Sequence, residues 1–259
     1  MHACAVLFLY WAGATSTTTT LDQIAGEYEG IRPSIDTAET WKLSIHSNGT
    51  YRSVFTERLV DTPRARSFAH DGVVKVEAGH LTLEWTLNPE TWGPLLDKFP
   101  PVPRTFTERF TPVSWGKRLY LINDSQADWF IRDVIRGDEP RSSGDGIHLL
   151  RVGDWKLRLS GRPEAPEDWK KKFPPDNFRT RVTRQVAYHR AEINAGSRNG
   201  LAVGMLLTLY SSKYGATDLR VVSVTAGTAL IENDYGDPPL TKGTRVYSRI
   251  PDTVETRGR

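Results

Sequence analysis

The sequence has almost no cysteine: Cys4 is the single cysteine among 259 residues, and only two methionines accompany it. A lone thiol cannot form a disulfide or a cysteine-ligated metal site within one chain. Cys4 lies inside an apolar run, where we interpret it as one more small apolar residue. Disulfide scaffolds and zinc-finger-type folds are therefore excluded for the single chain.

The sequence also lacks the local motifs of the common enzyme classes. It contains no P-loop, no G-x-S-x-G and no G-x-G-x-x-G after a strand, and its six histidines show no metal-ligand spacing. We therefore predict no catalytic residue, no cofactor and no metal site. Carboxylate pairs for hydrolysis converge in space rather than in sequence. A hydrolase acting on an envelope polymer thus stays open as the alternative.

Net charge is small, at +3, but it is unevenly distributed. Residues 21–161 hold 18 Lys and Arg against 20 Asp and Glu, a balance of −2, whereas residues 176–250 hold 10 against 6, a balance of +4. This asymmetry favours weak attraction to anionic surfaces and is too small to predict nucleic-acid binding.

The N-terminus carries an apolar run from Ala3 to Ala14, followed by a Thr-rich spacer. Its end, Ala12-Gly13-Ala14, has the small-x-small pattern of a signal-peptide cleavage site, and the run is too short to span a bilayer as a helix. No Lys or Arg precedes it, so either Met1 is an internal start or the run is not a signal. We predict a signal peptide and spacer over residues 1–20, periplasmic or secreted localisation, and no transmembrane span in the mature chain.

The sequence is rich in aromatic and β-branched residues, with eight Trp and nine Tyr. Such residues are typical of the pleated, half-buried surfaces of β-sheets. We predict a mainly β protein: an antiparallel lipocalin-like barrel over residues 21–160 and a small β-barrel or sandwich over 179–250. A Pro-rich, charged linker over 161–178 separates them, and 251–259 form a flexible tail.

Turn and cap residues locate several elements. Asn48-Gly49 and Ala78-Gly79 predict hairpins, and the spacing Thr20 to Gln23 predicts a capping box before a short helical turn. An apolar stripe at helical spacing predicts a helix over 125–136, with Ser125 as N-cap and Gly137 as stop; it either plugs a barrel end or packs on a sheet face. Further strands are expected at 105–112, 118–122, 147–152 and 155–159, and five in the C-terminal part at 182–194, 205–210, 219–225, 228–233 and 244–249.

The run GEYEG…WKLSIHSNGTYRSVF…GVVKVEAGHLTLEW, with Gly26-Glu27-Tyr28, Asn48 to Tyr51 and Gly79 to Leu83, resembles small lipocalin-like bacterial envelope domains. The resemblance covers residues 24–160 and implies a compact antiparallel barrel. The helix and a Pro-rich excursion at 88–103 depart from the simplest version of that pattern.

A second run, AEINAGSRNGLAVGMLLTLY…DLRVVSVTAGTALIEND…PLTKGTRVYSR, resembles a small β module of envelope and flagellum-assembly proteins. Examples are the C-terminal domain of FlgT and parts of the rod-shape scaffold protein MreC. Gly196, Gly200, Gly204, Gly243 and Val246 occupy the shared positions. The resemblance implies a packing or assembly module without catalytic residues.

Two stretches are candidates for contact with a ligand or partner. The Pro-rich loop 88–103 carries Trp92, Leu95, Leu96 and Phe99, which would face a ligand at the barrel mouth or, alternatively, clamp the barrel end. The basic segment with Lys170, Lys171, Lys172 and Arg179 would contact an anionic surface, or is simply a solvated linker.

Together these features predict an exported bacterial protein with a non-catalytic binding or scaffolding role in the cell envelope. Its partner would be an envelope protein or a small apolar ligand, with no nucleic acid expected.

Overall fold

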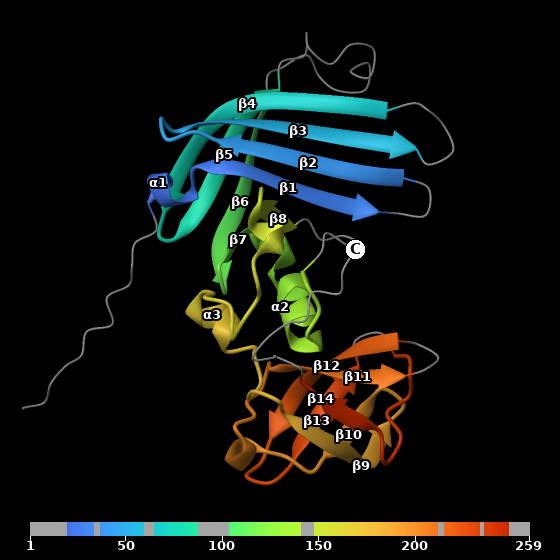
Figure 1. The fold of residues 1–259 in the computed structure, drawn as a ribbon. Helices are drawn as coiled ribbons and strands as arrows, with labels where there is room; N and C mark the ends of the chain where they lie inside the picture. Colours follow the sequence, from blue (N-terminus) through green and yellow to red (C-terminus); the bar gives the residue numbers. More distant parts are fainter. Residues whose placement is uncertain are drawn as a thin grey trace, which may run out of the picture.

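The computed structural model describes residues 20–33, 37–59, 65–87, 104–140, 148–211, 215–233 and 236–248. The protein is mainly β, with two closed antiparallel barrels, as predicted (Figure 1). Strands of the first barrel follow chain order: β1 (Gly26–Pro33), β2 (Thr37–Ile45), β3 (Thr50–Leu59), β4 (Ala65–Glu77), β5 (His80–Leu87), β6 (Arg104–Trp115), β7 (Arg118–Asn123) and β8 (His148–Arg151).

Local turn chemistry sets the register of the first barrel. Gly49 has φ 83°, and the Asn48 side chain accepts a hydrogen bond from the Thr50 backbone amide at 3.1 Å. Ala78 and Gly79 both have positive φ, which is the two-residue turn that suits the twist of a hairpin. Both predicted hairpins are confirmed. The capping box of α1 (Leu21–Ile24), from Thr20 to Gln23, is confirmed as well.

The strand pairing that closes the first barrel spans only one end of its long strands. Strand β8 pairs with β1 at Tyr28 and Glu29, and with β7 at residues 120–122. Beyond these positions β1 to β6 continue as a curved sheet, and Figure 1 shows the long strands running well past the short β8. We call this part, formed by residues 30–33 of β1, 104–109 of β6 and the strands between them, the flared end.

Two apolar cores lie on opposite faces of β6, β7 and β8, because side chains alternate along a strand. Phe110, Leu121 and Leu149 point into the barrel, where they join Tyr28, Leu43, Tyr51, Leu81 and Leu83. Trp115, Tyr120 and Ile122 point outward and pack against the apolar stripe of α2 (Ala127–Arg136). The helix therefore packs on the outer sheet face, and does not plug the barrel.

The predicted helix starts two residues later than expected. Asn123, not Ser125, caps the chain: its side chain accepts from the Ser125 amide at 3.1 Å and starts a 3₁₀ turn, Asp124–Gln126, before α2. Gly137 ends the helix in the left-handed region, at φ 75°, as predicted.

The strand expected at 155–159 is wrong. A 3₁₀ turn, Asp154–Lys156, stands there instead, because Gly153 takes a left-handed φ of 93° and reverses the chain. Residues 161–178, expected as a linker, do run between the two barrels and include the short helix α3 (Glu167–Lys170). Their apolar side chains are nevertheless buried: Trp169 is 5% and Phe173 2% exposed, in the same core as α2.

The second barrel has six strands rather than the five expected: β9 (Arg179–Ala187), β10 (Arg190–Ile193), β11 (Leu206–Ser211), β12 (Gly215–Val224), β13 (Ala229–Asn233) and β14 (Arg245–Tyr247). The single strand expected over 182–194 is two strands joined at Tyr188 and His189. Inward-facing Val182, Ile193, Leu209, Val221 and Ile231 fill the interior.

Helix α2 also contacts the second barrel. Leu206 of β11 belongs to the core that surrounds α2. Asp218 of β12 is 3% exposed and accepts two hydrogen bonds from the guanidinium of Arg136, at 3.0 and 2.7 Å, while Arg132 lies 3.6 Å away. The helix is thus packed between the outer face of one barrel and the wall of the other, as Figure 1 shows.

Candidate ligand-binding face

A row of aromatic rings crosses the inner surface of the flared end. Trp41 on β2 lies 4.8 Å from Phe55 on β3, which lies 6.1 Å from Phe68 on β4. A second run stacks His70 on Trp85 of β5 at 4.4 Å, and Trp85 on Phe106 of β6 at 4.5 Å. We call these six side chains the aromatic face: Trp41, Phe55, Phe68, His70, Trp85 and Phe106.

Register places the rings on one surface. Trp41 pairs with Phe55, Phe55 with Phe68, and Trp85 with Phe106. In its own strand, each of these residues is an even number of positions away from the side chains of the barrel core, so it lies on the same face of the sheet as the core. Five strands contribute, so four strand spacings give the face a width of about 19 Å. The aromatic face is therefore a continuation of the core into the open end of the barrel.

The rings are not covered as core residues are. Buried core side chains such as Leu81 and Leu83 are 0–2% exposed, whereas Phe106 is 38% exposed and the other five are half-buried. Contiguous, accessible aromatic surface on the inner face of a curved sheet is typical of a binding site for an apolar ligand.

Tyr51 forms the floor below these rings, edge-on to His70 with ring centroids 5.7 Å apart. It is 1% exposed, and burial raises the pKa of its phenol above the ordinary value. Gly72 on the neighbouring strand makes room for it, because a Cβ there would lie 2.7 Å from Tyr51 Cε1 and 2.1 Å from the Glu84 carbonyl oxygen.

Carboxylates lie beside the rings. Glu39 of β2 and Glu57 of β3 are directly opposite each other. Glu39 lies two residues before Trp41, and Glu57 lies two residues after Phe55. On the other side of β3, Arg66 of β4 is directly opposite Glu57. Glu108 stands two residues after Phe106; partial desolvation raises its pKa. Burial lowers the pKa of His70, which disfavours the charged imidazolium form.

The predicted ligand-facing residues Trp92, Leu95, Leu96 and Phe99 lie outside the described residues. The strands that flank them, β5 ending at Leu87 and β6 beginning at Arg104, do reach the flared end. That these four residues face a ligand stays a prediction. The aromatic face was not predicted from the sequence. Its signal in the sequence is the spacing of two residues between Trp41 and Leu43 and between Leu83 and Trp85, which places each tryptophan on the face of a core leucine.

Two of the four predicted basic contact residues form ion pairs within the chain, and whether the four contact an anionic surface stays a prediction. Lys170 pairs with Glu167 at 2.7 Å on α3, and Lys172 reaches Asp128 of α2 at 2.5 Å. Lys171 and Arg179 are exposed, the first after α3 and the second at the start of β9. Two of the four ammonium or guanidinium groups are therefore engaged in ion pairs within the chain.

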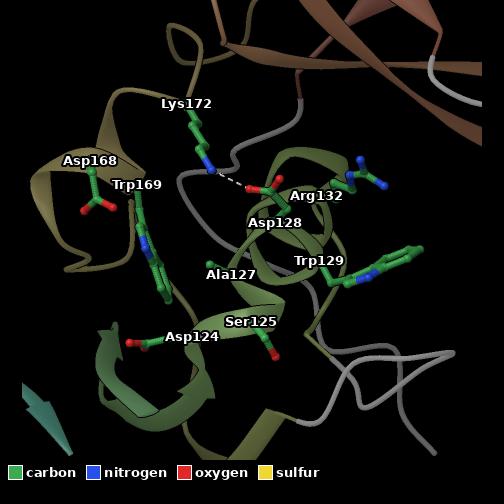
Figure 2. Close-up of a pocket in the computed structure, with 9 residues that line it drawn as sticks. All are labelled: Asp124, Ser125, Ala127, Asp128, Trp129, Arg132, Asp168, Trp169 and Lys172. Carbon is green, nitrogen blue, oxygen red and sulfur yellow. Dashed lines mark hydrogen bonds and ion pairs between the residues drawn. The ribbon is translucent and has the colours of Figure 1, made fainter. Parts of the chain in front are cut away.

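Lys172 and Asp128 line a polar pocket of about 570 Å³ between α2 and α3. Figure 2 shows the Lys172 amine directed at the Asp128 carboxylate, with the Trp169 ring along the wall. The full lining is Asp124, Ser125, Ala127, Asp128, Trp129, Arg132, Asp168, Trp169 and Lys172. Its one internal ion pair and its acidic rim give it no set of groups matched to a particular ligand.

One histidine lies beside a hydroxyl, as a nucleophilic enzyme would require. Thr111 Oγ1 lies 3.0 Å from His80 Nδ1 and donates to Asp124 Oδ1 at 2.6 Å, while His80 Nδ1 also faces Asp124 Oδ2 at 3.1 Å. A relay needs the base to use one ring nitrogen for the nucleophile and the other for the acid. Here both partners face Nδ1, so the cluster ties β5 and β6 to the 3₁₀ turn.

Among the described residues, no three His, Cys, Asp or Glu side chains gather as metal ligands, and no helix is long and apolar enough to cross a membrane. A scan against models of protein families found no match, and searches of curated proteins and of solved structures found none either.

Proposed function

We propose that this protein is a non-catalytic binding protein whose aromatic face holds a small, largely apolar ligand with flat surfaces. The observation that carries this proposal is the incomplete burial of six neighbouring rings on the inner face of the flared end: five are half-buried and Phe106 is exposed. A ligand stacked on Phe55, Trp85 and Phe106 would remove apolar surface from water, at about 25 cal/mol for each Å² covered.

The proposed setting is the bacterial cell envelope, after export. The apolar N-terminal run and the two envelope-type resemblances support that setting. In this proposal the second barrel serves as an assembly module, rigidly attached through α2, and the first barrel presents the ligand.

Fluorescence of the neutral apolar probe N-phenyl-1-naphthylamine tests the proposal. We expect saturable binding to the full chain, with loss of at least about tenfold in affinity for the Phe55→Ala/Phe106→Ala double variant, since each truncation removes a stacking partner. The matched control is Tyr210→Ala, which removes a 66% exposed ring from the second barrel and should leave probe binding unchanged.

Equal probe binding by the wild type and the double variant would contradict the proposal. Circular dichroism of the double variant should match that of the wild type, because Phe55 and Phe106 are only partly buried.

A hydrolase is the second candidate, and the Glu39–Glu57 pair beside the aromatic face is the specific observation in its favour. Two carboxylates across a sugar ring are the machinery of glycoside hydrolysis. Release of reducing ends from purified peptidoglycan glycan strands by the wild type, abolished in Glu57→Gln, would support this candidate. No release at all would leave binding as the function.

A further inference from the structure

Three arginines gather on the outer wall of the second barrel. Arg181 of β9 is directly opposite Arg245 of β14, and Arg179 lies two residues earlier on β9. Val182 and Val246 point into the core, so these three arginines point outward, and all three are exposed. Cross-strand neighbours are about 5 Å apart and same-face neighbours about 7 Å apart.

Lys242 adds a fourth cation. It lies in the turn before β14, where the Gly243 amide donates to the Val182 carbonyl and the Val182 amide donates to the Thr244 carbonyl. The turn is thereby tied to β9 next to Arg181. We call Arg179, Arg181, Lys242 and Arg245 the basic cluster.

The described acidic side chains of this barrel are engaged elsewhere. Glu192 pairs with Arg184, Glu232 with Arg190, and Asp218 with Arg136; Asp237 accepts a hydrogen bond from Tyr188. Over the part of the chain that the structure describes, no carboxylate lies within ion-pair distance of a member of the basic cluster. Among the described residues, the carboxylates of this barrel pair with Arg136, Arg184 and Arg190 and with none of the four cations of the basic cluster.

Like charges directly opposite each other in an antiparallel pair are destabilising. A barrel that keeps Arg181 against Arg245 carries that cost in its free form, and a bound anion would remove it. The planar guanidinium presents a fork of N–H donors that matches the oxygens of phosphate.

We propose that the basic cluster is a binding site for a phosphoryl group. Three guanidinium groups and one ammonium at neighbouring positions of the β9–β14 wall favour a group with more than one negative charge and several acceptor oxygens over a single carboxylate. The phosphoryl group belongs either to a soluble phosphorylated molecule or to a lipid headgroup, which present the same chemistry.

Isothermal titration of the full chain with inorganic pyrophosphate tests the site. We expect binding to the wild type and a loss of at least tenfold in affinity for Arg181→Gln/Arg245→Gln. The matched control is Arg184→Gln/Arg190→Gln, which removes the same two charges from the same barrel but from arginines already paired with Glu192 and Glu232. It should retain the wild-type affinity within a factor of two.

Thermal unfolding provides a second readout. Without anion, the Arg181→Gln/Arg245→Gln variant should melt no lower than the wild type, because a repulsive pair has been removed. Pyrophosphate should raise the Tm of the wild type and not that of the variant. An equal loss of affinity in both double variants, or no pyrophosphate binding by the wild type together with no vesicle binding, would overturn the proposal.

Sedimentation with vesicles identifies the source of the phosphoryl group. Vesicles of phosphatidylcholine with phosphatidic acid should bind the wild type and not the variant if a lipid headgroup is the ligand. Pyrophosphate binding without vesicle binding points to a soluble ligand. Either result supports the site, and vesicles of phosphatidylcholine alone serve as the blank.

Discussion

Gly72 shows how one residue can support the floor of the aromatic face. A Cβ at this position would stand 2.1 Å from the Glu84 carbonyl oxygen and 2.7 Å from Tyr51 Cε1. The first contact is with backbone, which cannot turn away as a flexible side chain can. The absence of a side chain at residue 72 therefore leaves room for the Tyr51 ring, which meets His70 edge-on, and for the pairing of β4 with β5.

We expect Gly72→Ala to destabilise the first barrel by about 1–3 kcal/mol, the range for overpacking in a filled interior. Urea denaturation followed by tryptophan fluorescence measures this. Gly227→Ala is the control, because a Cβ at residue 227 would meet nothing within 4 Å. Equal stability of the two variants would show that the strands move apart at no cost.

Glu108 gives the flared end a pH dependence at the residue scale. Desolvation raises the pKa of Glu108 in the folded state, so the folded protein binds a proton at this carboxyl more readily than the unfolded chain does. Ionisation of Glu108 then opposes folding above the folded pKa, and this penalty disappears as the pH falls below the unfolded pKa, near 4.3. Removing the charge should therefore stabilise the protein at neutral pH and not in acid.

We expect Glu108→Gln to raise Tm relative to the wild type at pH 7 and to leave it unchanged at pH 4. Differential scanning calorimetry at both pH values checks this. Glu77→Gln, an exposed carboxyl at the end of the same sheet, is the control and should show no such difference. A Tm increase of equal size at both pH values would disprove the assignment to ionisation.

At the scale of elements, Arg118 holds the segment after β8 against β7. Its side chain is fully buried; it donates to the carbonyl oxygens of Leu157 at 2.6 Å and Trp155 at 2.8 Å, and it pairs with Glu139. The Asp154 carboxylate accepts from the Leu119 amide at 2.9 Å in the same place. The Arg118 side chain thus supplies hydrogen bonds to carbonyls that a neighbouring strand would have bonded if residues 155–159 had formed the expected strand.

Arg118→Met should cost about 3–5 kcal/mol, because it leaves Glu139 and two partly buried carbonyls without the donor that is itself fully buried. Urea denaturation measures the loss, and limited proteolysis should show faster cleavage within 152–158. Arg158→Met, an exposed arginine in the same segment, should change neither. Unaltered stability of the Arg118 variant would mean that the 3₁₀ turn keeps its conformation without hydrogen bonds from Arg118.

The elements that sequence reasoning located are those fixed by neighbours in the chain. The turn that holds Asn48 and Gly49 lies within residues 46–49, and the stripe of α2 together with Gly137 is complete within eleven residues. The strand expected at 155–159 is absent for one local and one distant reason: Gly153 turns the chain, and Arg118, far away in sequence, donates hydrogen bonds to the carbonyls of Trp155 and Leu157. The aromatic face depends on register across five strands, from Trp41 to Phe106, which no local pattern specifies.

At the scale of the whole molecule, helix α2 couples the two barrels. Its apolar stripe packs on β6 to β8, while Arg136 and Arg132 reach the buried Asp218 of β12. A carboxylate that is 3% exposed needs these partners, since an unpaired buried charge is costly. The segment with Trp169 and Phe173 fills the remaining space, so the outer wall of the first barrel, α2 and Leu206 of the second barrel share one apolar cluster that is separate from the two barrel interiors.

Asp218→Asn should therefore uncouple the barrels as they unfold, at a cost on the order of 3 kcal/mol to their contact. All eight tryptophans precede residue 170, before the second barrel begins at Arg179. Tryptophan fluorescence thus reports on the first barrel and its helix, whereas far-UV circular dichroism reports on both barrels. We expect coincident urea transitions for the wild type and separated transitions for Asp218→Asn. Asp176→Asn, which removes an exposed carboxylate paired with Arg162, should keep them coincident. Separated transitions already in the wild type would mean that the two barrels unfold independently. The contacts of α2 with the second barrel would then contribute nothing to cooperative unfolding.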